Sequence, residues 1–218
     1  AKSVAPEDIL FDAGFTSRDE ALEYGVRPGD SIVPKTETVW TANKQALIGK
    51  AWDNRYGCAV MLEAMRAVKD KELAATIIAG ANAQEEVGLR GAKGATHKLN
   101  PAISFALDTG TAGDTPGMTT KEADSELGKG PQVLIYDASM IPHKGLRDFV
   151  IDVAEEEGIP FQFTSIKGGG TDAGAQHQSL DGVPSIAITI PVRYLHSHTS
   201  IIHENDFMGP LTLSRLYQ

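Results

Sequence analysis

Five side chains in this 218-residue chain have the types and positions that suit a divalent metal ion. They are four carboxylates and one imidazole, each beside an expected strand or helix end: Asp53, Glu85, Glu86, Asp108 and His196. Carboxylate and imidazole ligands together suit zinc, cobalt or manganese. Because Glu85 and Glu86 are neighbours, one can bind a metal while the other acts on water. The combination predicts a metal site with a general base beside it.

Each of these residues also has an ordinary structural explanation. Asp53 could cap a helix, and the pair Glu85 and Glu86 could begin one in solvent. Asp108 could close a turn before Thr109-Gly110. His196 could be a half-buried histidine with a hydrogen-bond partner. Taken singly, these explanations are favoured; the metal site is predicted from the residues together.

Alternating strands and helices must position these groups. Apolar runs predict strands at 74–83, 102–107, 133–136, 161–166 and 185–190. Helical spacing of apolar residues predicts helices over 55–69 and 146–154, with shorter ones at 89–97 and between the last two strands. Glu85 and Asp108 then stand directly after strands, where ligands of open α/β proteins gather. Continuous apolar strands between amphipathic helices indicate an α/β sandwich with a buried sheet.

The first 45 residues have a different character. Ser17-x-x-Glu20 predicts the start of a short helix that Gly25 ends, and the sequence 27–30 predicts a turn. Short strands are expected at 31–33 and 36–41, which makes this piece small and mostly β. Because the chain begins at Ala1 and ends in an expected helix at Tyr217-Gln218, we expect it to be part of a longer protein.

Composition excludes several classes of protein. The net charge of −9 disfavours nucleic acid as a partner, since phosphate-binding surfaces are basic. No apolar run approaches the roughly 20 residues that span a bilayer, and no basic amphipathic segment points to a membrane surface. The single cysteine, Cys58, excludes an intramolecular disulfide and a cysteine zinc cluster, and we expect it in the core. A cytoplasmic location is expected because the start does not read as a leader peptide.

Five motifs occur in the order and spacing of a known family. They are KAWDNRYG at 50–57, QEEVGLRGA at 84–92, LDTGTAGDTPG at 107–117, GGGTDAG at 168–174 and RYLHSH at 193–198. With them the chain resembles the glutamyl aminopeptidase and tetrahedral aminopeptidase family of dinuclear-metal exopeptidases, some members of which have been labelled cellulases or endoglucanases. The resemblance covers nearly the whole chain.

The resemblance implies a fold and a domain division. The fold is an α/β three-layer sandwich with a mixed, mostly parallel sheet, interrupted by an inserted small β-barrel-like dimerisation domain. Residues 1–44 would be the C-terminal part of that inserted domain, and residues 45–218 an incomplete catalytic domain. The chain would thus be truncated at both ends, with Gly209-Pro210 where the family has an unbroken helix. Homo-oligomers from dimer to dodecamer are implied, without nucleic acid or membrane.

The resemblance also assigns roles to the predicted site residues. Two divalent ions, zinc or cobalt, would be bridged by Asp53, with Glu86 and His196 completing one ion's ligands and Asp108 binding the other. Glu85 would be the general base of a peptide-hydrolysing site that releases N-terminal residues. A hydroxide shared by the metals would attack the scissile carbonyl, and Glu85 would then protonate the leaving amine.

One metal ligand of the family is missing from this sequence. Family members carry a further histidine in a His-x-Asp motif, and none of the histidines here has Asp two residues later: 97, 143, 177, 196, 198 and 203. One metal site could therefore be complete while the other lacks its histidine. An inactive or assembly-only fragment with a single metal ion is the alternative to an active enzyme.

The glycine-rich segment allows another alternative. Gly168-x-Gly170-x-x-Ala173 formally fits a dinucleotide fingerprint, which would indicate a nucleotide-binding oxidoreductase, but the acidic residue expected about 20 positions later is missing. In the family this stretch lies beside the active site, so Thr171 and Asp172 are predicted substrate contacts or a helix cap. Arg193 is expected to pair with Asp172 or with substrate, or to be an ordinary surface residue.

Overall fold

The computed structural model describes residues 4–119 and 123–208 of the chain. The chain divides into two units, residues 1–35 and residues 36–218. The boundary predicted at residue 44, between the inserted β domain and the catalytic domain, stays a prediction. The expected helix at Tyr217-Gln218 and the break at Gly209-Pro210 both lie outside the described residues.

The first unit is small. Its described residues, 4–35, contain a 3-10 turn, η1 (Pro6–Asp8), and one helix, α1 (Arg18–Glu23). The hydroxyl of Ser17 accepts a hydrogen bond from Glu20 N (3.1 Å), as the Ser-x-x-Glu spacing predicts. The turn at 27–30 is confirmed by a hydrogen bond from Asp30 N to Arg27 O (3.1 Å). The predicted strand at 31–33 is wrong: no strand occurs among the described residues of this unit, because an extended segment needs a neighbour for its backbone groups.

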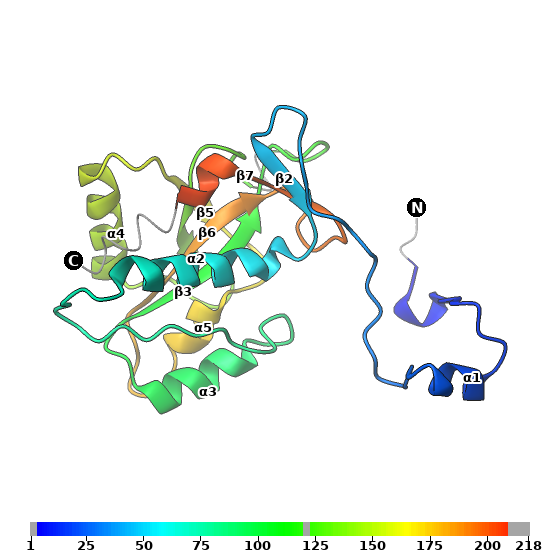
Figure 1. The fold of residues 1–218 in the computed structure, drawn as a ribbon. Helices are drawn as coiled ribbons and strands as arrows, with labels where there is room; N and C mark the ends of the chain where they lie inside the picture. The colour runs from blue at the N-terminus through cyan, green and yellow to red at the C-terminus, as the bar shows by residue number, and fades with distance from the viewer. Residues whose placement is uncertain (1–3, 120–122, 209–218) are drawn as a thin grey trace. The chain divides into compact units, whose positions relative to one another are not determined.

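A four-stranded sheet forms the centre of the second unit (Figure 1). Its strands lie in the order β3 (Ser104–Thr111), β6 (Ser185–Val192), β4 (Gln132–Tyr136) and β5 (Gln162–Ser165). The pairs β3–β6 and β4–β5 are parallel, whereas β4 and β6 are antiparallel. The sheet is therefore mixed and mostly parallel, as expected. Every residue of β6 is buried, in keeping with its continuous apolar sequence.

Helices cover both faces of this sheet. The alternate side chains Ile186, Ile188 and Ile190 of β6 pack with α2 (Trp52–Val68) and α4 (Lys144–Glu156). On the opposite face, Ala187 packs with Ala173 of the short helix α5 (Asp172–Gln176). Helix α3 (Arg90–Leu99) lies against α5. The result is the expected three-layer α/β sandwich.

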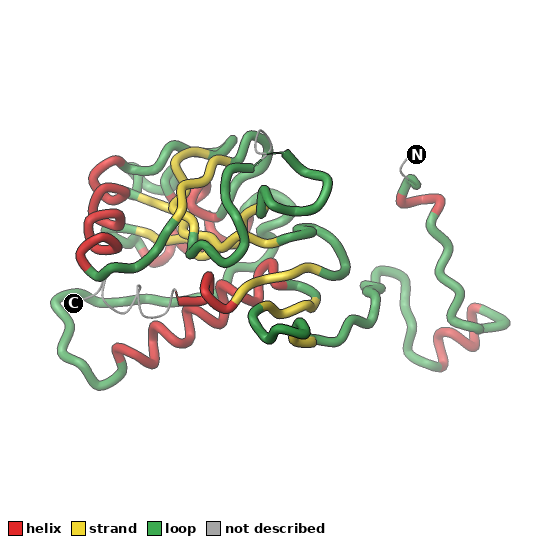
Figure 2. Tube along the Cα trace, turned by 90° about the horizontal axis from the view of Figure 1, so that it is seen from above, coloured by secondary structure: helices red, strands yellow, loops and turns green. Residues whose placement is uncertain are grey.

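A second, three-stranded antiparallel sheet lies at one end of the unit. It consists of β1 (Val39–Trp40), β2 (Ala46–Gly49) and β7 (Ser200–His203), followed by the 3-10 turn η2 (Glu204–Met208). The strand predicted at 36–41 thus shrinks to Val39–Trp40. The pairing of β2 with β7 brings the segment before α2 next to the segment after β6. Loops and turns, green in Figure 2, connect these helices and strands.

Residues 74–83 do not form the strand that their apolar sequence predicts. The segment is a loop between α2 and α3, and Ile78 within it is 54% exposed. No strand among residues 4–119 and 123–208 pairs with it, so its backbone cannot join a ladder. Glu85 and Glu86 therefore follow a loop, not a strand.

Two further predictions are wrong. Asp108 does not follow its strand but lies inside it, because β3 continues to Thr111. Cys58 is exposed rather than buried, since the core stripe of α2 runs through Tyr56, Val60 and Ala64 and Cys58 lies on the opposite side of the helix.

Within the described ranges, no helix is both long and apolar enough to cross a bilayer.

Candidate metal centre

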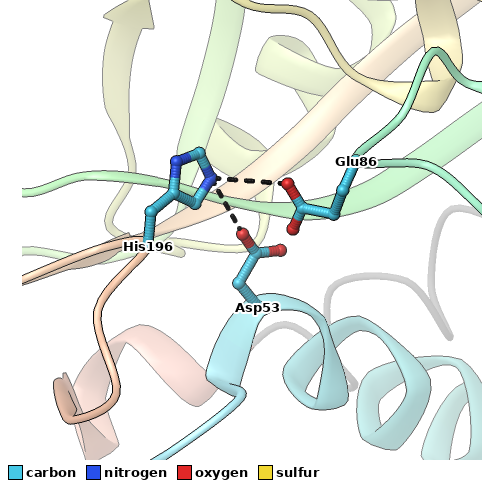
Figure 3. A group of neighbouring side chains, drawn as sticks. All are labelled: Asp53, Glu86 and His196. Atoms are coloured by element: carbon cyan, nitrogen blue, oxygen red, sulfur yellow. Dashed lines mark ion pairs between the residues drawn. The ribbon is translucent and has the colours of Figure 1, made fainter. Parts of the chain in front are cut away.

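Three of the predicted metal ligands meet at one point (Figure 3). Nε2 of His196 lies 3.2 Å from Oδ2 of Asp53 and 3.7 Å from Oε2 of Glu86. One ligand atom from each residue lies within 4.8 Å of the other two. The three residues come from the start of α2, the loop before α3 and the loop after β6. Carboxylate and imidazole atoms at this spacing fit the ligands of one divalent ion.

Asp53 is positioned by the irregular start of α2. Asp53 and Asn54 have non-helical backbone angles, and the peptide bond between them is cis. The amide of Asn54 donates to Leu107 O on β3 (2.7 Å), and its oxygen accepts from Gly57 N (2.7 Å). A Cβ on Gly57 would lie 2.5 Å from Leu107 O, so glycine allows the helix to approach the strand. These contacts hold Asp53 at the edge of the sheet.

Glu85 and Glu86 lie on a tight turn that leads into α3. Gly88 N and Leu89 N both donate to Glu85 O, at 3.0 and 2.9 Å. The turn uses left-handed backbone angles at Gln84 (φ 61°) and Leu89 (φ 55°), conformations that are uncommon for residues other than glycine. Outside the turn, the amide of Asn82 donates to Oδ2 of Asp172 (2.8 Å). The loop bearing both glutamates is thus tied to the start of α5.

Negative charge accumulates around these residues. Burial, and then the charge of Glu86, raises the pKa of Asp53 to about 6. Burial, with the charges of Glu86 and Asp172, raises the pKa of Glu85 to about 7. Asp108 is 8% exposed, and burial raises its pKa to about 8 even though Thr109 N donates to it. A divalent cation would stabilise the ionised forms of these crowded carboxylates, so the charge distribution fits such an ion.

Asp108 lies near the three ligands but is not one of the group. The charges of Asp53 and Glu85 both contribute to raising its pKa, but the cluster of ligand atoms contains only Asp53, Glu86 and His196. Its Oδ1 accepts from its own neighbour Thr109 N (2.8 Å). The described residues therefore bring Asp53, Glu86 and His196 together, with Glu85 and Asp108 beside them.

The predicted substrate contacts have varied surroundings. Thr171 is 1% exposed, and its hydroxyl lies 3.4 Å from Oδ2 of Asp137. Asp172 is half-buried, and burial raises its pKa while the hydrogen bond from Asn82 lowers it. Arg193 does not pair with Asp172; its guanidinium binds Asp114 instead. The substrate roles of these three residues stay predictions.

The glycine-rich segment is explained by packing. A Cβ on Gly170 would lie 2.6 Å from Oγ of Ser139, and one on Gly174 would lie 1.9 Å from the same atom. Both glycines thus let the start of α5 approach the loop after β4. This close approach accounts for Gly170 and Gly174 without a nucleotide, whereas a Cβ on Gly168 would meet no atom within 4 Å.

Sequence reasoning missed three polar residues that link the segments around the site. Asn54 and Asp114 lie inside motifs recognised from the sequence, and Asn82 lies just before one. Their types are common in turns, and their partners are 53, 79 and 90 residues away in the chain. The one feature of the sequence that could have identified these three residues is that they lie within or beside the recognised motifs.

Comparison with known proteins agrees with this fold and site. The family model for M42 glutamyl aminopeptidases matches residues 1–213. The glutamyl aminopeptidase of Lactococcus lactis is 45% identical over 211 residues, which are 97% of this chain and 58% of that protein. The chain thus spans somewhat more than half the length of this relative.

Solved structures show the same likeness. The TET aminopeptidase from the marine sediment archaeon Thaumarchaeota archaeon SCGC AB-539-E09 has a TM-score of 0.94 and 42% identity, covering 99% of this chain and 61% of that one. The TET1 peptidase of Pyrococcus horikoshii, which can assemble into a tetrahedron or a large octahedral shell, has a TM-score of 0.84 and 35% identity, covering 100% of this chain and 63% of that one. Together with the motif residues around Asp53, Glu86 and His196, these matches show that the chain belongs to the M42 glutamyl aminopeptidase family.

Proposed function

We propose that this chain forms the larger part of a metal-dependent aminopeptidase that releases N-terminal residues from peptides. The observation that carries the proposal is the meeting of Asp53, Glu86 and His196 beside a glutamate, Glu85, whose pKa is raised to about 7. A carboxyl group with a pKa near neutrality can both accept and return a proton. Membership of an aminopeptidase family supplies the reaction class.

The residues divide into metal ligands and a base. Asp53, Glu86 and His196 would hold one divalent ion, zinc or cobalt, and Asp53 with Asp108 would contribute to a second. When bound, such ions polarise the scissile carbonyl and make water more acidic. Glu85 would accept the proton of the attacking water and transfer it to the departing amine. Glu85 is half-buried beside the ligands, in keeping with this role.

Substrate and assembly follow from the family. The substrates would be peptides with a free amino terminus, and Thr171, Asp172 and Arg193 are the proposed contacts in the glycine-rich and RYLHSH motifs. Residues 1–44 would belong to an inserted β domain, and residues 45–218 to the catalytic domain. A homo-oligomer is expected, because the P. horikoshii relative can assemble into a tetrahedron or a large octahedral shell. We also keep the cytoplasm as the expected location.

The test is metal-dependent release of p-nitroaniline. The purified chain, stripped of metal, is incubated with the p-nitroanilides of Glu, Leu and Ala, with and without added zinc or cobalt, while bound metal is counted. About two ions per chain with metal-dependent release would support the active enzyme.

Two other outcomes separate the alternatives. One ion per chain without release would favour the single-metal, inactive fragment, which the missing His-x-Asp motif makes a specific possibility. No bound ion would contradict the metal centre.

A further inference from the structure

His196 lies in a loop that does little to hold its side chain by packing. The imidazole is 67% exposed, so neighbouring atoms cover only a third of it. Its direction toward Asp53 and Glu86 must therefore come from the backbone of residues 193–201. That backbone is strained, since Tyr194 (φ 59°) and His196 (φ 61°) both have left-handed angles. A strained loop keeps one conformation only when surrounding contacts determine it.

The two ends of the loop are joined to each other. Arg193 N donates to Ile201 O and Ile201 N donates to Arg193 O, both at 3.1 Å. Arg193 directly follows β6, and Ile201 belongs to β7. This bridge closes the loop, and the pairing of β7 with β2 fixes its far end to the segment that leads into α2.

The side chain of Arg193 supplies a second connection. Its Nε lies 3.3 Å from Oδ1 of Asp114, and its Nη2 binds Oδ2. The planar guanidinium thus donates a hydrogen bond to each carboxylate oxygen. Asp114 Oδ1 also accepts from Leu127 N (3.3 Å). Both side chains are about 70% buried, with exposed fractions of 31% and 26%, which makes this pair less screened than the Lys144–Asp148 pair on α4.

The Asp114–Arg193 pair links two neighbouring strands that both lead into the site. Asp114 stands three residues after β3, the strand that carries Asp108, and Arg193 stands one residue after β6. These strands are parallel, and Ala112 N donates to Val192 O (3.0 Å) just beyond their ends. The pair therefore fixes the start of the His196 loop against the loop that leaves β3.

We propose that Asp114 and Arg193 are positioning residues that hold His196 toward Asp53 and Glu86. The proposal rests on the metal centre proposed above and adds residues that touch none of its ligands. In this role Arg193 acts on metal binding through the loop, in addition to the substrate contact proposed above. Partners beyond the first ligands commonly alter metal affinity 10–100-fold when removed.

The test measures cobalt affinity of the full chain by isothermal titration calorimetry. We expect Asp114→Ala and Arg193→Ala each to weaken cobalt binding by roughly 10–100-fold. The double variant should bind no more weakly than the weaker single variant, because the two residues act as one unit. Arg193→Lys, which keeps the charge but loses the planar two-point contact, should give an intermediate affinity. The thermal midpoint of each metal-free variant, measured in parallel, shows that the titrated protein is folded.

The matched control is Asp148→Ala. Asp148 also pairs with basic side chains, Lys144 and Arg147, but on α4 away from the site. This variant should keep the parent's cobalt affinity. Equal affinity in the parent and the Asp114 and Arg193 variants would overturn the positioning role, as would losses that multiply in the double variant.

Two further outcomes are decisive. If either alanine variant fails to fold, Asp114→Asn replaces it: reduced cobalt affinity supports the proposal, and parental affinity overturns it. If the parent itself binds no cobalt, the proposed metal centre is wrong and the positioning role falls with it. A parent that binds cobalt alongside unchanged variants contradicts the positioning role alone.

Discussion

Exposure differs sharply among the five site residues. The side chains of His196 and Glu86 are 67% and 60% exposed, that of Asp53 is 18% exposed, and Asp108 is 8% exposed. The buried carboxylates have raised pKa values because removal from water disfavours their charge. Glu85 lies between these extremes, with a pKa of about 7. A half-buried carboxyl with a pKa near neutrality suits a general base better than a metal ligand.

Replacing Glu85 by glutamine tests its role as a base. Glu85→Gln keeps the size and polarity of the side chain but cannot accept a proton. We expect metal-dependent release of p-nitroaniline to fall by about 10²–10⁴-fold, the usual contribution of general base catalysis. Cobalt affinity should not weaken, since Glu85 is not one of the three proposed ligands.

Two comparisons accompany this variant. Glu86→Gln should weaken cobalt binding, because it removes a proposed ligand, and Glu72→Gln on the exposed loop after α2 should change neither property. Parental turnover in Glu85→Gln would remove Glu85 from the base role.

At the scale of secondary-structure elements, the position of α5 is set by its close approach to a neighbouring loop. Helix α5 is only five residues long, and its position depends on the contact of Gly174, and of Gly170 just before it, with the loop after β4. Ser139 in that loop is held by Asp137, whose Oδ1 accepts from Ser139 N (2.6 Å) and from Met140 N (2.8 Å). Because Ser139 is fixed in this way, it cannot move aside for a new side chain. The start of α5, which bears Asp172, thus depends on this contact.

Adding one methyl group should disturb this contact. The Cβ of Gly174→Ala would lie 1.9 Å from Oγ of Ser139, well inside van der Waals distance. Overpacking of this kind typically lowers the free energy of unfolding by 1–3 kcal/mol, so we expect a loss of about 2 kcal/mol in urea denaturation. Adding Ser139→Gly should recover part of the loss.

Gly94→Ala is the matched control. Gly94 lies within α3 with no atom within 4 Å of the added Cβ, and alanine is the better helix former. We expect this variant to raise the free energy of unfolding by about 0.5–1 kcal/mol. A Gly174→Ala variant as stable as the parent would contradict the packing argument.

The whole second unit carries an electrostatic cost at neutral pH. Burial raises the pKa values of Asp53, Glu85 and Asp108 to about 6, 7 and 8, and that of Asp206 to about 6. In the unfolded chain these groups titrate near 4. The folded state thus binds more protons than the unfolded state between these values, so stability must fall as pH rises through this interval.

The thermal midpoint of the metal-free chain tests this linkage. We expect it to decrease as pH rises from about 4 to about 8, because each raised carboxyl must lose its proton within the fold at a cost. The pKa values of Asp114 and Asp148 are lowered instead, so their ionised forms stabilise the fold. That contribution is lost only as pH falls through the lowered values, at the acidic end of the profile. Differential scanning fluorimetry across buffers of constant ionic strength would measure the profile.

Two changes should flatten the profile. Saturating cobalt binds the folded state and should raise the midpoint most at neutral pH. Glu85→Gln removes one titrating group and should reduce the slope without cobalt. A midpoint that increases steadily from pH 4 to 8 in the metal-free chain would contradict the raised pKa values.

The sequence by itself determined the elements with strong local patterns and the residue types of the site. The apolar stripes predicted α2 and α4, the continuous apolar run predicted β6, and Ser17 with Glu20 predicted the start of α1; all four are confirmed. These signals are local because each depends on spacing within one turn or one strand.

Only the tertiary structure decided which residues meet. The run 74–83 has the composition of a strand but lacks a neighbour to pair with, and Cys58 has an apolar setting but faces away from the core. Asp114 and Arg193 look like ordinary polar residues until β3 and β6 bring them together. Pairing, burial and charge depend on contacts between distant segments, so they are properties of the assembled sheet and its loops. The sequence determined which groups could bind a metal ion, and the assembled fold brought Asp53, Glu86 and His196 within reach of one another.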